Sequence, residues 1–375
     1  MTKCLLFFII QAMEGPESLK FTEKTGKTED DYFQLIAGEN DNDRRIDRII
    51  RKILPELSLS KVYSSIRKGL IRINGGKVSE KKRVKKDDKI SVHKSLYYPY
   101  TAGSVTSESI GRIKPPALQM DKINVIFENE FILAVDKPSG IPVQDSRKPG
   151  SELISWLKEY VNNTRPEEGL SFTPGPLNRI DKETSGLVFF SGNLYGAREF
   201  SEWIRLHLCR KFYLAIVSGI FDLKKEWTKW EDKLLKVPNN PKVQVSEKGL
   251  YACSFVKPLA VCSEKNISLL LVSIKTGRTH QIRVQCGERQ HHIIGDKIYG
   301  GASTQLQRKN LFLHSWMMGF PPEKRKYLNL PEFLSAQIPD YFAMEIENNF
   351  GKEMLAWIIN QPYNEIINGF NTYYI

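Results

Sequence analysis

The chain has 375 residues, of which 41% are apolar and 26% are charged, so it is long enough for two folded domains and too apolar for a disordered chain. Its formal net charge of +12 indicates a polyanionic partner. The stretch from Arg44 to Lys94 carries 17 Lys and Arg against 5 Asp and Glu, an excess equal to the whole net charge. Charge concentrated in this way is typical of a phosphate-binding module, so nucleic acid is favoured over a membrane surface.

The five cysteines form no C-x-x-C pair and show no metal-ligand spacing with histidine. This pattern argues against zinc and against disulfides, and it favours a reduced, cytoplasmic setting. The apolar stretch at 5–10 is too short to span a bilayer. We interpret residues 1–12 as a dispensable leader, with Met13 as an alternative start, at the head of a polar tail over 1–40.

A pair of short helices is predicted after a first strand at 32–36. Isoleucine and leucine recur at helical spacing from 46 to 54, with Asp43 as the expected N-cap. Ser60 is expected to cap a second helix, which Gly69 ends.

A β-hairpin is predicted at 70–78, because Asn74-Gly75 favours the positive φ of a tight turn, and a last strand is expected at 89–92. The resulting unit, at 41–94, resembles an S4 domain, an RNA-binding module with an αα-hairpin and β-strands. The match includes R-K-G-x-I-R-I-N-G at 67–75. The alternative is a solvated basic face without function. The resemblance implies RNA contacts from the basic side chains Lys61, Arg67, Lys68 and Arg72.

Residues 95–120 are rich in Pro, Gly, Ser and Thr without any period, so a linker is predicted there. Two strands are expected within 124–135, at the start of a second domain over 121–330. An aromatic and apolar extension at 331–375 is expected to pack on that domain. Strands and helices mix in no repeating order, which favours an α+β class. Helices are expected at 153–162, 196–208 and 350–359.

The stretch at 176–186, P-L-N-R-I-D-K-E-T-S-G, precedes a short apolar run at 187–190. The run is β-branched and aromatic and is bounded by Ser-Gly pairs, so it predicts a buried strand, and Asp181 is expected in the turn that enters a sheet. An acid and an arginine two residues apart, here Asp181 and Arg179, can serve one site. Taken alone, such a pair is more often a surface ion pair or a turn cap.

Four further motifs accompany this stretch in a fixed order, at 137–143, 210–219, 276–284 and 295–300. Together they resemble the RluA-type pseudouridine synthases over about 123–320. The resemblance implies a mixed, mainly antiparallel sheet. It also implies isomerisation of uridine in RNA to pseudouridine, without a metal or a cofactor.

The same resemblance implies four residue roles. Asp181 matches the catalytic aspartate, and Arg283, in an H-Q-I-R strand, pairs with it and keeps it ionised. Tyr213 matches the active-site tyrosine, which stacks on the base and assists removal of the C5 proton. Arg179 matches the arginine that enters the gap left by a flipped nucleotide. His280 is interpreted as a buried histidine that orients the backbone.

Two departures from the family pattern concern Asn178, where the family usually has histidine, and 290–293, which reads Q-H-H-I instead of G-H-P-I. Asn178 cannot become charged, so the hydrogen bonding beside the aspartate is expected to differ. The appended S4-like unit favours large-subunit ribosomal RNA as substrate, as in the RluC-like branch, with transfer RNA as the alternative. An inactive RNA-binding or ribosome-assembly protein is a rival hypothesis, and a monomer is expected. A third hypothesis is a hydrolase that acts on sugars or esters with a pair of carboxylates. It is disfavoured because no second acidic partner for Asp181 stands at a motif position.

Overall fold

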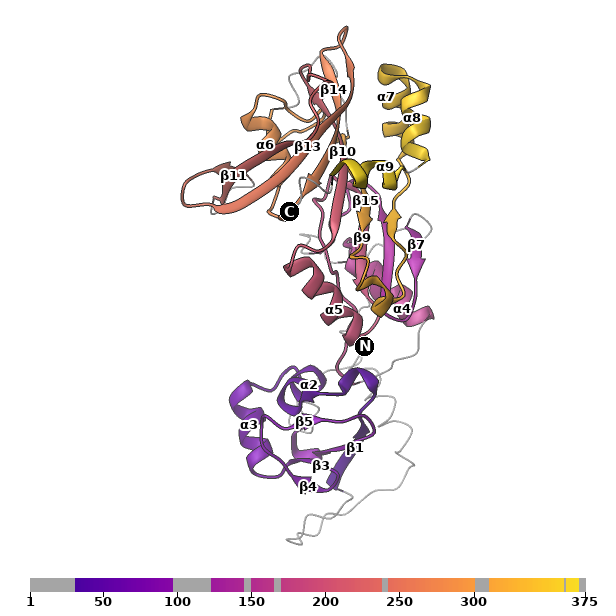
Figure 1. Ribbon diagram of the computed structural model, residues 1–375. Coiled ribbons are helices and arrows are strands. Elements are labelled where there is room, and N and C mark those ends of the chain that lie inside the picture. The colour runs from indigo at the N-terminus through magenta and orange to yellow at the C-terminus, as the bar shows by residue number, and fades with distance from the viewer. Residues whose placement is uncertain are drawn as a thin grey trace, which may run out of the picture. The chain divides into compact units, whose positions relative to one another are not determined.

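The structure is a computed structural model that describes residues 31–96, 123–144, 150–164, 170–237, 242–300, 310–360 and 362–370. The described residues form two compact units (Figure 1). The first lies within Met1–Ile113 and Arg165–Thr173, and the second within Lys114–Thr164 and Pro174–Ile375. The predicted leader, and most of the predicted tail and linker, lie outside the described residues.

The first unit packs two helices against a four-stranded sheet with the order β1-β6-β3-β4, and a second ladder joins β2 to β5. Isoleucines of α2 and Val62 and Ile66 of α3 are fully buried in its core. Asn74 and Gly75 both have positive φ, 49° and 77°, so the predicted tight turn is present. The elements are β1 (Tyr32–Ile36), β2 (Arg44–Arg45), α2 (Ile46–Ile53), α3 (Leu59–Arg67), β3 (Ile71–Ile73), β4 (Gly76–Lys77), β5 (Arg83–Val84) and β6 (Lys89–His93).

Both helix caps predicted for this unit are wrong. Arg45 occupies the N-cap position of α2, while Asp43 has a φ of 60° and forms an ion pair of 2.9 Å with Arg83. The N-cap of α3 is Ser58, whose hydroxyl accepts a backbone N–H at 3.3 Å. Ser60 lies inside the first turn of α3, where its hydroxyl cannot act as the cap.

A distant segment of the chain completes the first unit. The Leu170 N–H donates to the Oδ2 of Asp41 at 2.7 Å, and the Ser171 hydroxyl donates to the Oδ1. The backbone N–H of Gly38 supplies another donor at 3.0 Å. Because Asp41 is wholly buried, its carboxylate needs these donors. The unit is therefore not one continuous stretch of sequence.

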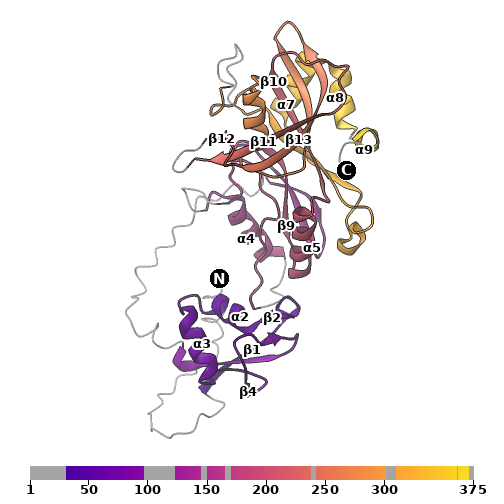
Figure 2. The ribbon, with the colours of Figure 1, turned by 60° about the vertical axis from the view of Figure 1, so that its left-hand side comes forward.

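The second unit is built on a ten-stranded sheet with the order β12-β11-β13-β14-β10-β15-β9-β8-β7, in which β16 pairs with β15. Its described strand pairs are antiparallel except for β15 and β9, which are parallel. The expected α+β class with a mixed, mainly antiparallel sheet is confirmed (Figure 2). The strands are β7 (Asn124–Glu128), β8 (Ile132–Lys137), β9 (Ser185–Ser191), β10 (Arg210–Ser218), β11 (Thr228–Lys236), β12 (Val243–Val245), β13 (Leu250–Cys262), β14 (Ile267–Ile274), β15 (Leu313–Gly319) and β16 (Phe333–Ser335).

Helices near the end of the chain pack on this sheet (Figure 1). Phe342, Ile358 and Phe370, one from each of α7, α8 and α9, are fully buried in a core shared with Phe212 of β10. The helix expected at 350–359 is preceded by a separate one, because Gly351 interrupts the two with a φ of 92°. The helices are α4 (Leu153–Thr164), α5 (Leu194–Arg205), α6 (Gln281–Glu288), α7 (Asp340–Phe350), α8 (Lys352–Ile359) and α9 (Tyr363–Phe370).

Residues 281–288 form the helix α6, and not the strand expected from the H-Q-I-R motif. The Val284 N–H bonds the His280 carbonyl at 2.9 Å, as in a helix. Ile282 and Cys286 pack in one core cluster, and Val284 packs in another. The strand was expected from the family resemblance, and a short apolar stretch does not by itself distinguish a strand from a buried helix.

Candidate active site

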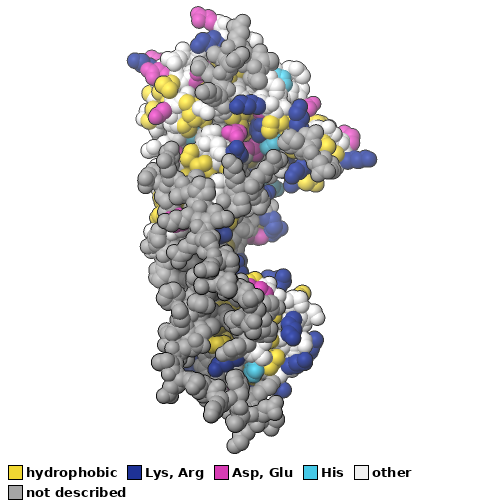
Figure 3. Space-filling model, turned by 180° about the vertical axis from the view of Figure 1, so that it is seen from behind, with side chains coloured by type: hydrophobic (Ala, Val, Ile, Leu, Met, Phe, Trp, Pro, Cys, Tyr) yellow, Lys and Arg dark blue, Asp and Glu magenta, His cyan; other side chains and the backbone are white. Residues whose placement is uncertain are grey.

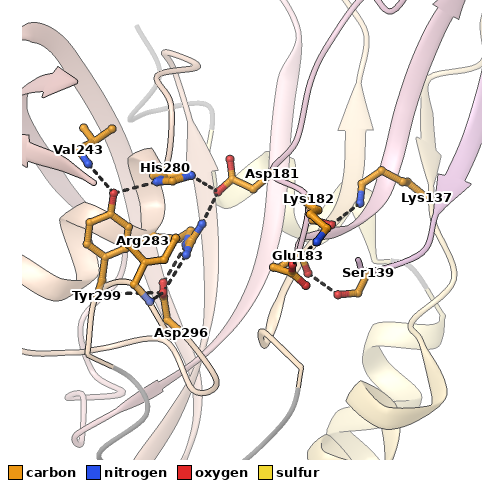
Figure 4. Close-up of polar contacts among 11 residues, drawn as sticks. Lys137, Ser139, Asp181, Lys182, Glu183, Val243, His280, Arg283, Asp296 and Tyr299 are labelled. Atoms are coloured by element: carbon orange, nitrogen blue, oxygen red, sulfur yellow. Dashed lines mark hydrogen bonds and ion pairs between the residues drawn. The ribbon is translucent and has the colours of Figure 1, made fainter. Parts of the chain in front are cut away.

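Asp181 lies in the loop that enters β9, with 22% of its side chain exposed. The two residues after it are held through their carbonyl oxygens (Figure 4). Lys137 Nζ donates to the Lys182 carbonyl at 3.0 Å, and Ser139 Oγ donates to the Glu183 carbonyl at 2.6 Å. The K-P-S-G motif therefore fixes the main chain beside Asp181.

Lys137 is fully buried at the end of β8. Its Nζ donates to three backbone carbonyl oxygens, those of Pro138 at 2.9 Å, Ile141 at 2.8 Å and Lys182 at 3.0 Å. Three acceptors use all three hydrogens of an ammonium group. Burial lowers the pKa of Lys137 to about 7, while the negative charges of Glu183 and Asp181 oppose this shift. Lys137 thus anchors two motifs to each other.

Arg283, from α6, connects two carboxylates. Its Nη1 donates to Asp181 Oδ2 at 3.1 Å, and its Nε and Nη2 donate to the two oxygens of Asp296, each at 2.8 Å. Only 4% of the Arg283 side chain and 1% of the Asp296 side chain are exposed. Burial opposes both charges, but the hydrogen-bonded pairing holds the pKa of Asp296 below its usual value and raises the pKa of Arg283. Asp181 therefore faces a permanently charged donor.

His280 faces the same carboxylate, so its interpretation as a residue that only orients the backbone is wrong. Its Nε2 is 3.8 Å from Asp181 Oδ2, and its Nδ1 is 2.8 Å from the Tyr299 hydroxyl. The signal was present in the sequence. A helical interpretation of 280–284 would have put His280 and Arg283 on neighbouring positions three residues apart.

Tyr213, on β10, is 7% exposed and packs in a core cluster against which Ile180, next to Asp181, also lies. Burial raises the pKa of Tyr213 to about 12, and the charge of Asp181 acts in the same direction. Tyr213 is therefore a neutral phenol near pH 7. The exposed Arg179 forms no hydrogen bond or ion pair with the described residues.

Asn178 binds the strand that follows the loop of Asp181. Its Oδ1 accepts the Phe189 N–H at 2.7 Å, and its Nδ2 lies 3.3 Å from the Leu187 carbonyl. The side-chain amide of Asn178 thus binds the backbone of β9 with one donor and one acceptor. Neither hydrogen bond requires a charged side chain.

Basic side chains gather on the described surface of the first unit (Figure 3). Lys61 and Lys68 are exposed, and their ammonium groups have no hydrogen-bond or ion-pair partner among the described residues. Arg67 pairs with Glu80 at 3.0 Å. The guanidinium carbon of Arg72 lies 4.6 Å from the centre of the Tyr32 ring. The two lysines are therefore the members of the predicted set whose charged groups have neither an ion pair nor a ring contact among the described residues.

Within the described ranges, no group of three or more His, Cys, Asp or Glu residues is arranged to hold a metal ion. In the same ranges, no helix combines the length and the apolar character that crossing a bilayer requires.

An aspartate paired with a buried arginine, beside a neutral tyrosine on a mixed sheet, together with an S4-like unit, is typical of RNA pseudouridine synthases. Residues 131–288 match the family model for RNA pseudouridylate synthase, and 44–90 match the S4 domain model. A ribosomal large subunit pseudouridine synthase C from Buchnera aphidicola is 30% identical over 320 residues, which cover 82% of this chain and 95% of the relative. The enzyme of the same name from Pasteurella multocida is 27% identical over 310 residues, 77% of this chain and 86% of the relative. The chain belongs to the RNA pseudouridine synthase family and is an isomerase.

Proposed function

We propose that this protein converts specific uridines of large-subunit ribosomal RNA to pseudouridine, with Asp181 as the acting carboxylate and without a cofactor. In this reaction the bond from ribose C1′ to N1 breaks and a bond from C1′ to C5 forms. The C5 hydrogen leaves as a proton, and N1 gains one. The ion pair between Asp181 and Arg283 carries the proposal, because it directs a permanently charged donor at a carboxylate that is still partly exposed to a substrate.

The other site residues fit the remaining needs of the reaction. Tyr213 is the residue that would stack on the uracil, as the family resemblance implies, and its hydroxyl stays protonated near pH 7. Arg179 is exposed two residues before Asp181, so its guanidinium is available to fill the position that a flipped nucleotide leaves. The names of the relatives support ribosomal RNA as the substrate class.

Tritium release from RNA labelled at uridine C5 tests the reaction, because the new carbon–carbon bond must expel that hydrogen. We expect release by the native protein and none by Asp181→Asn. Asp222→Asn is the matched control, since this carboxylate lies in an exposed turn after β10 and should leave release unchanged. Equal release by native protein and Asp181→Asn would remove Asp181 from the mechanism.

The substrate class is tested with the same assay on separate RNA pools. We expect release from large-subunit ribosomal RNA to exceed release from small-subunit ribosomal RNA and from transfer RNA. Preference for transfer RNA would replace the proposed substrate and keep the chemistry. No release from any pool, despite tight binding, would favour an inactive RNA-binding protein. A ribosomal substrate also implies a cytoplasmic protein.

A further inference from the structure

A chain of polar contacts runs from β12 to the catalytic carboxylate (Figure 4). The backbone N–H of Val243 donates to the Tyr299 hydroxyl at 2.8 Å. The same hydroxyl is 2.8 Å from His280 Nδ1, and His280 Nε2 is 3.8 Å from Asp181 Oδ2. Three separate parts of the sequence are therefore linked in series to one oxygen of Asp181.

The hydroxyl of Tyr299 determines which nitrogen of His280 carries the proton. Val243 already donates to this hydroxyl, and the only other partner of its oxygen within the described chain is His280 Nδ1. If Nδ1 carried a hydrogen, the hydroxyl would accept twice and its own hydrogen would have no acceptor. Donation from Tyr299 to Nδ1 satisfies every group. The imidazole hydrogen then lies on Nε2, toward Asp181.

The surroundings of His280 keep its imidazole neutral. Burial lowers the pKa of His280, and the positive charges of Arg283 and Lys236 act in the same direction. Asp181 and Asp296 oppose them with negative charges, and the phenol of Tyr299 is uncharged near pH 7 because burial raises its pKa. The lowering influences prevail, so His280 offers Asp181 a hydrogen-bond donor and not a second cation.

We propose that His280 and Tyr299 are positioning residues for Asp181, in which Tyr299 locks the Nε2–H tautomer and this N–H joins Arg283 Nη1 in holding Oδ2. The proposal rests on the proposed function and adds an atomic assignment to it. Both donors approach Oδ2, and no described residue bonds Oδ1. Oδ1 is therefore the oxygen presented to the nucleotide. The distance of 3.8 Å shortens to a hydrogen bond when RNA is bound, as such contacts in free enzymes do.

The tautomer can be measured without activity. In protein with ¹⁵N-labelled histidine, the chemical shifts of the two ring nitrogens distinguish a protonated from an unprotonated nitrogen, and the spectrum of His280→Gln identifies the signals. We expect Nε2–H with unprotonated Nδ1 at pH 7, and exchange between both tautomers in Tyr299→Phe. The Phe variant keeps the aromatic ring that lies 5.3 Å from the Arg283 guanidinium and removes only the hydroxyl. A protonated Nδ1 in the native protein would overturn the proposal.

Kinetics separate positioning from a purely structural role. Glutamine has a donor near the place of Nε2, so His280→Gln should keep most of kcat, whereas the shorter His280→Asn should lose roughly tenfold, the scale of one hydrogen bond to a charged group. Asparagine also tolerates the left-handed backbone at this position, where φ is 54°. KM should change little in either variant.

A double-mutant comparison completes the test. Tyr299→Phe should lower kcat in the native background but not in His280→Gln, which has no tautomer to lock. His291→Asn is the matched control, because His291 bonds the Ser218 carbonyl and does not face Asp181. Equal losses from Tyr299→Phe in both backgrounds, or equal activity of the Gln and Asn variants, would refute the positioning role. Native protein without tritium release would instead refute the proposed function, while the ¹⁵N result would still stand.

Discussion

Asp296 holds the guanidinium of Arg283 through two hydrogen bonds of 2.8 Å, and this leaves Nη1 of the same guanidinium directed at Asp181. Backbone N–H groups of Ile298 and Tyr299 also donate to Asp296 Oδ1, at 2.9 and 3.2 Å. The orientation of the charged partner of Asp181 therefore depends on a residue that does not itself bond Asp181.

Asp296→Asn should reduce kcat by about 100-fold and destabilise the fold by about 3 kcal/mol, because it leaves Arg283 buried with one carboxylate instead of two. The amide also places N–H hydrogens opposite those of the guanidinium, which breaks the two-point contact. Tritium release and urea denaturation measure the two effects.

Asp232→Asn is the control for this change. Asp232 binds Arg289 at 3.0 Å in a partly exposed pair that does not approach Asp181. We expect its kcat to equal that of the native protein. A similar loss of kcat in both variants would show that general destabilisation, and not the orientation of Arg283, explains the effect of Asp296→Asn.

Gly186→Ala should prevent correct entry of the loop of Asp181 into β9. Gly186 has a φ of 110°, and a Cβ there would lie 2.1 Å from the Ser315 carbonyl oxygen across the parallel β9–β15 pair. Since the strain and the clash add, we expect a loss of at least ~3 kcal/mol in the free energy of unfolding, measured in urea. Gly175→Ala, with no atom within 4 Å of its added Cβ, should fold with nearly native stability.

Lys137→Met should lower both stability and kcat. Methionine fills much of the same volume but leaves the carbonyls of Pro138 and Ile141 without their side-chain donor, and the Lys182 carbonyl with the Gly140 N–H as its remaining donor, at a cost of about 3 kcal/mol. The Lys182 carbonyl adjoins Asp181, so kcat should fall even at temperatures where the variant is fully folded. Circular dichroism establishes the folded fraction, and tritium release measures the activity. Full activity of the folded variant would show that the other loop contacts suffice.

The sequence predicted the strand β9 because the run at 187–190 is strongly apolar and lies between turn residues. Most strands between β10 and β16 received no prediction from local pattern. Motif order alone placed Asp181, Tyr213 and Arg283 in one site. The helical state of 281–288 was missed because the H-Q-I-R motif was interpreted as a strand from the family resemblance. Only tertiary burial shows that Ile282 and Val284 face different clusters.

Other features depend on contacts that local pattern does not contain. The bonds from Leu170 and Ser171 to Asp41 join residues about 130 positions apart, so no window of sequence could show them. The prediction of Asp43 as an N-cap was wrong for a similar reason, because the Asp43 carboxylate instead binds Arg83, which is 40 residues away. The contact of His280 with Tyr299 likewise requires the fold of α6.

His314 should make the protein less stable in mild acid. It is fully buried on β15, bonded to Ser185 Oγ at 2.8 Å, and burial lowers its pKa from about 6.5 to about 3. Between these values the unfolded chain binds a proton that the folded protein does not, so the free energy of unfolding falls as pH drops below 6.5. This single group contributes at most ~1.4 kcal/mol per pH unit.

Urea denaturation between pH 7 and pH 4 measures this slope. In His314→Gln the starting stability should be lower and the acid slope shallower than in the native protein. His291→Gln, at a partly exposed site on the same unit, should keep the native slope. An unchanged slope in His314→Gln would assign the acid sensitivity to other groups.

Removal of charge at Lys61 and Lys68 should weaken RNA binding and reduce its dependence on salt. Each lysine that contacts a phosphate releases about one counterion, so Lys61→Gln with Lys68→Gln should reduce the slope of log K against log salt by about 2. Lys352→Gln removes the same charge from a highly exposed site on α8 that pairs with Glu347, and it should leave the slope unchanged. Filter binding or fluorescence anisotropy over a range of salt concentrations measures both slopes.

Equal slopes for the S4 double variant and the α8 control would mean that the positive charge of the first unit does not engage RNA at these two lysines. A lower slope with unchanged tritium release at saturating RNA would show that the unit captures RNA while the chemistry belongs to the second unit.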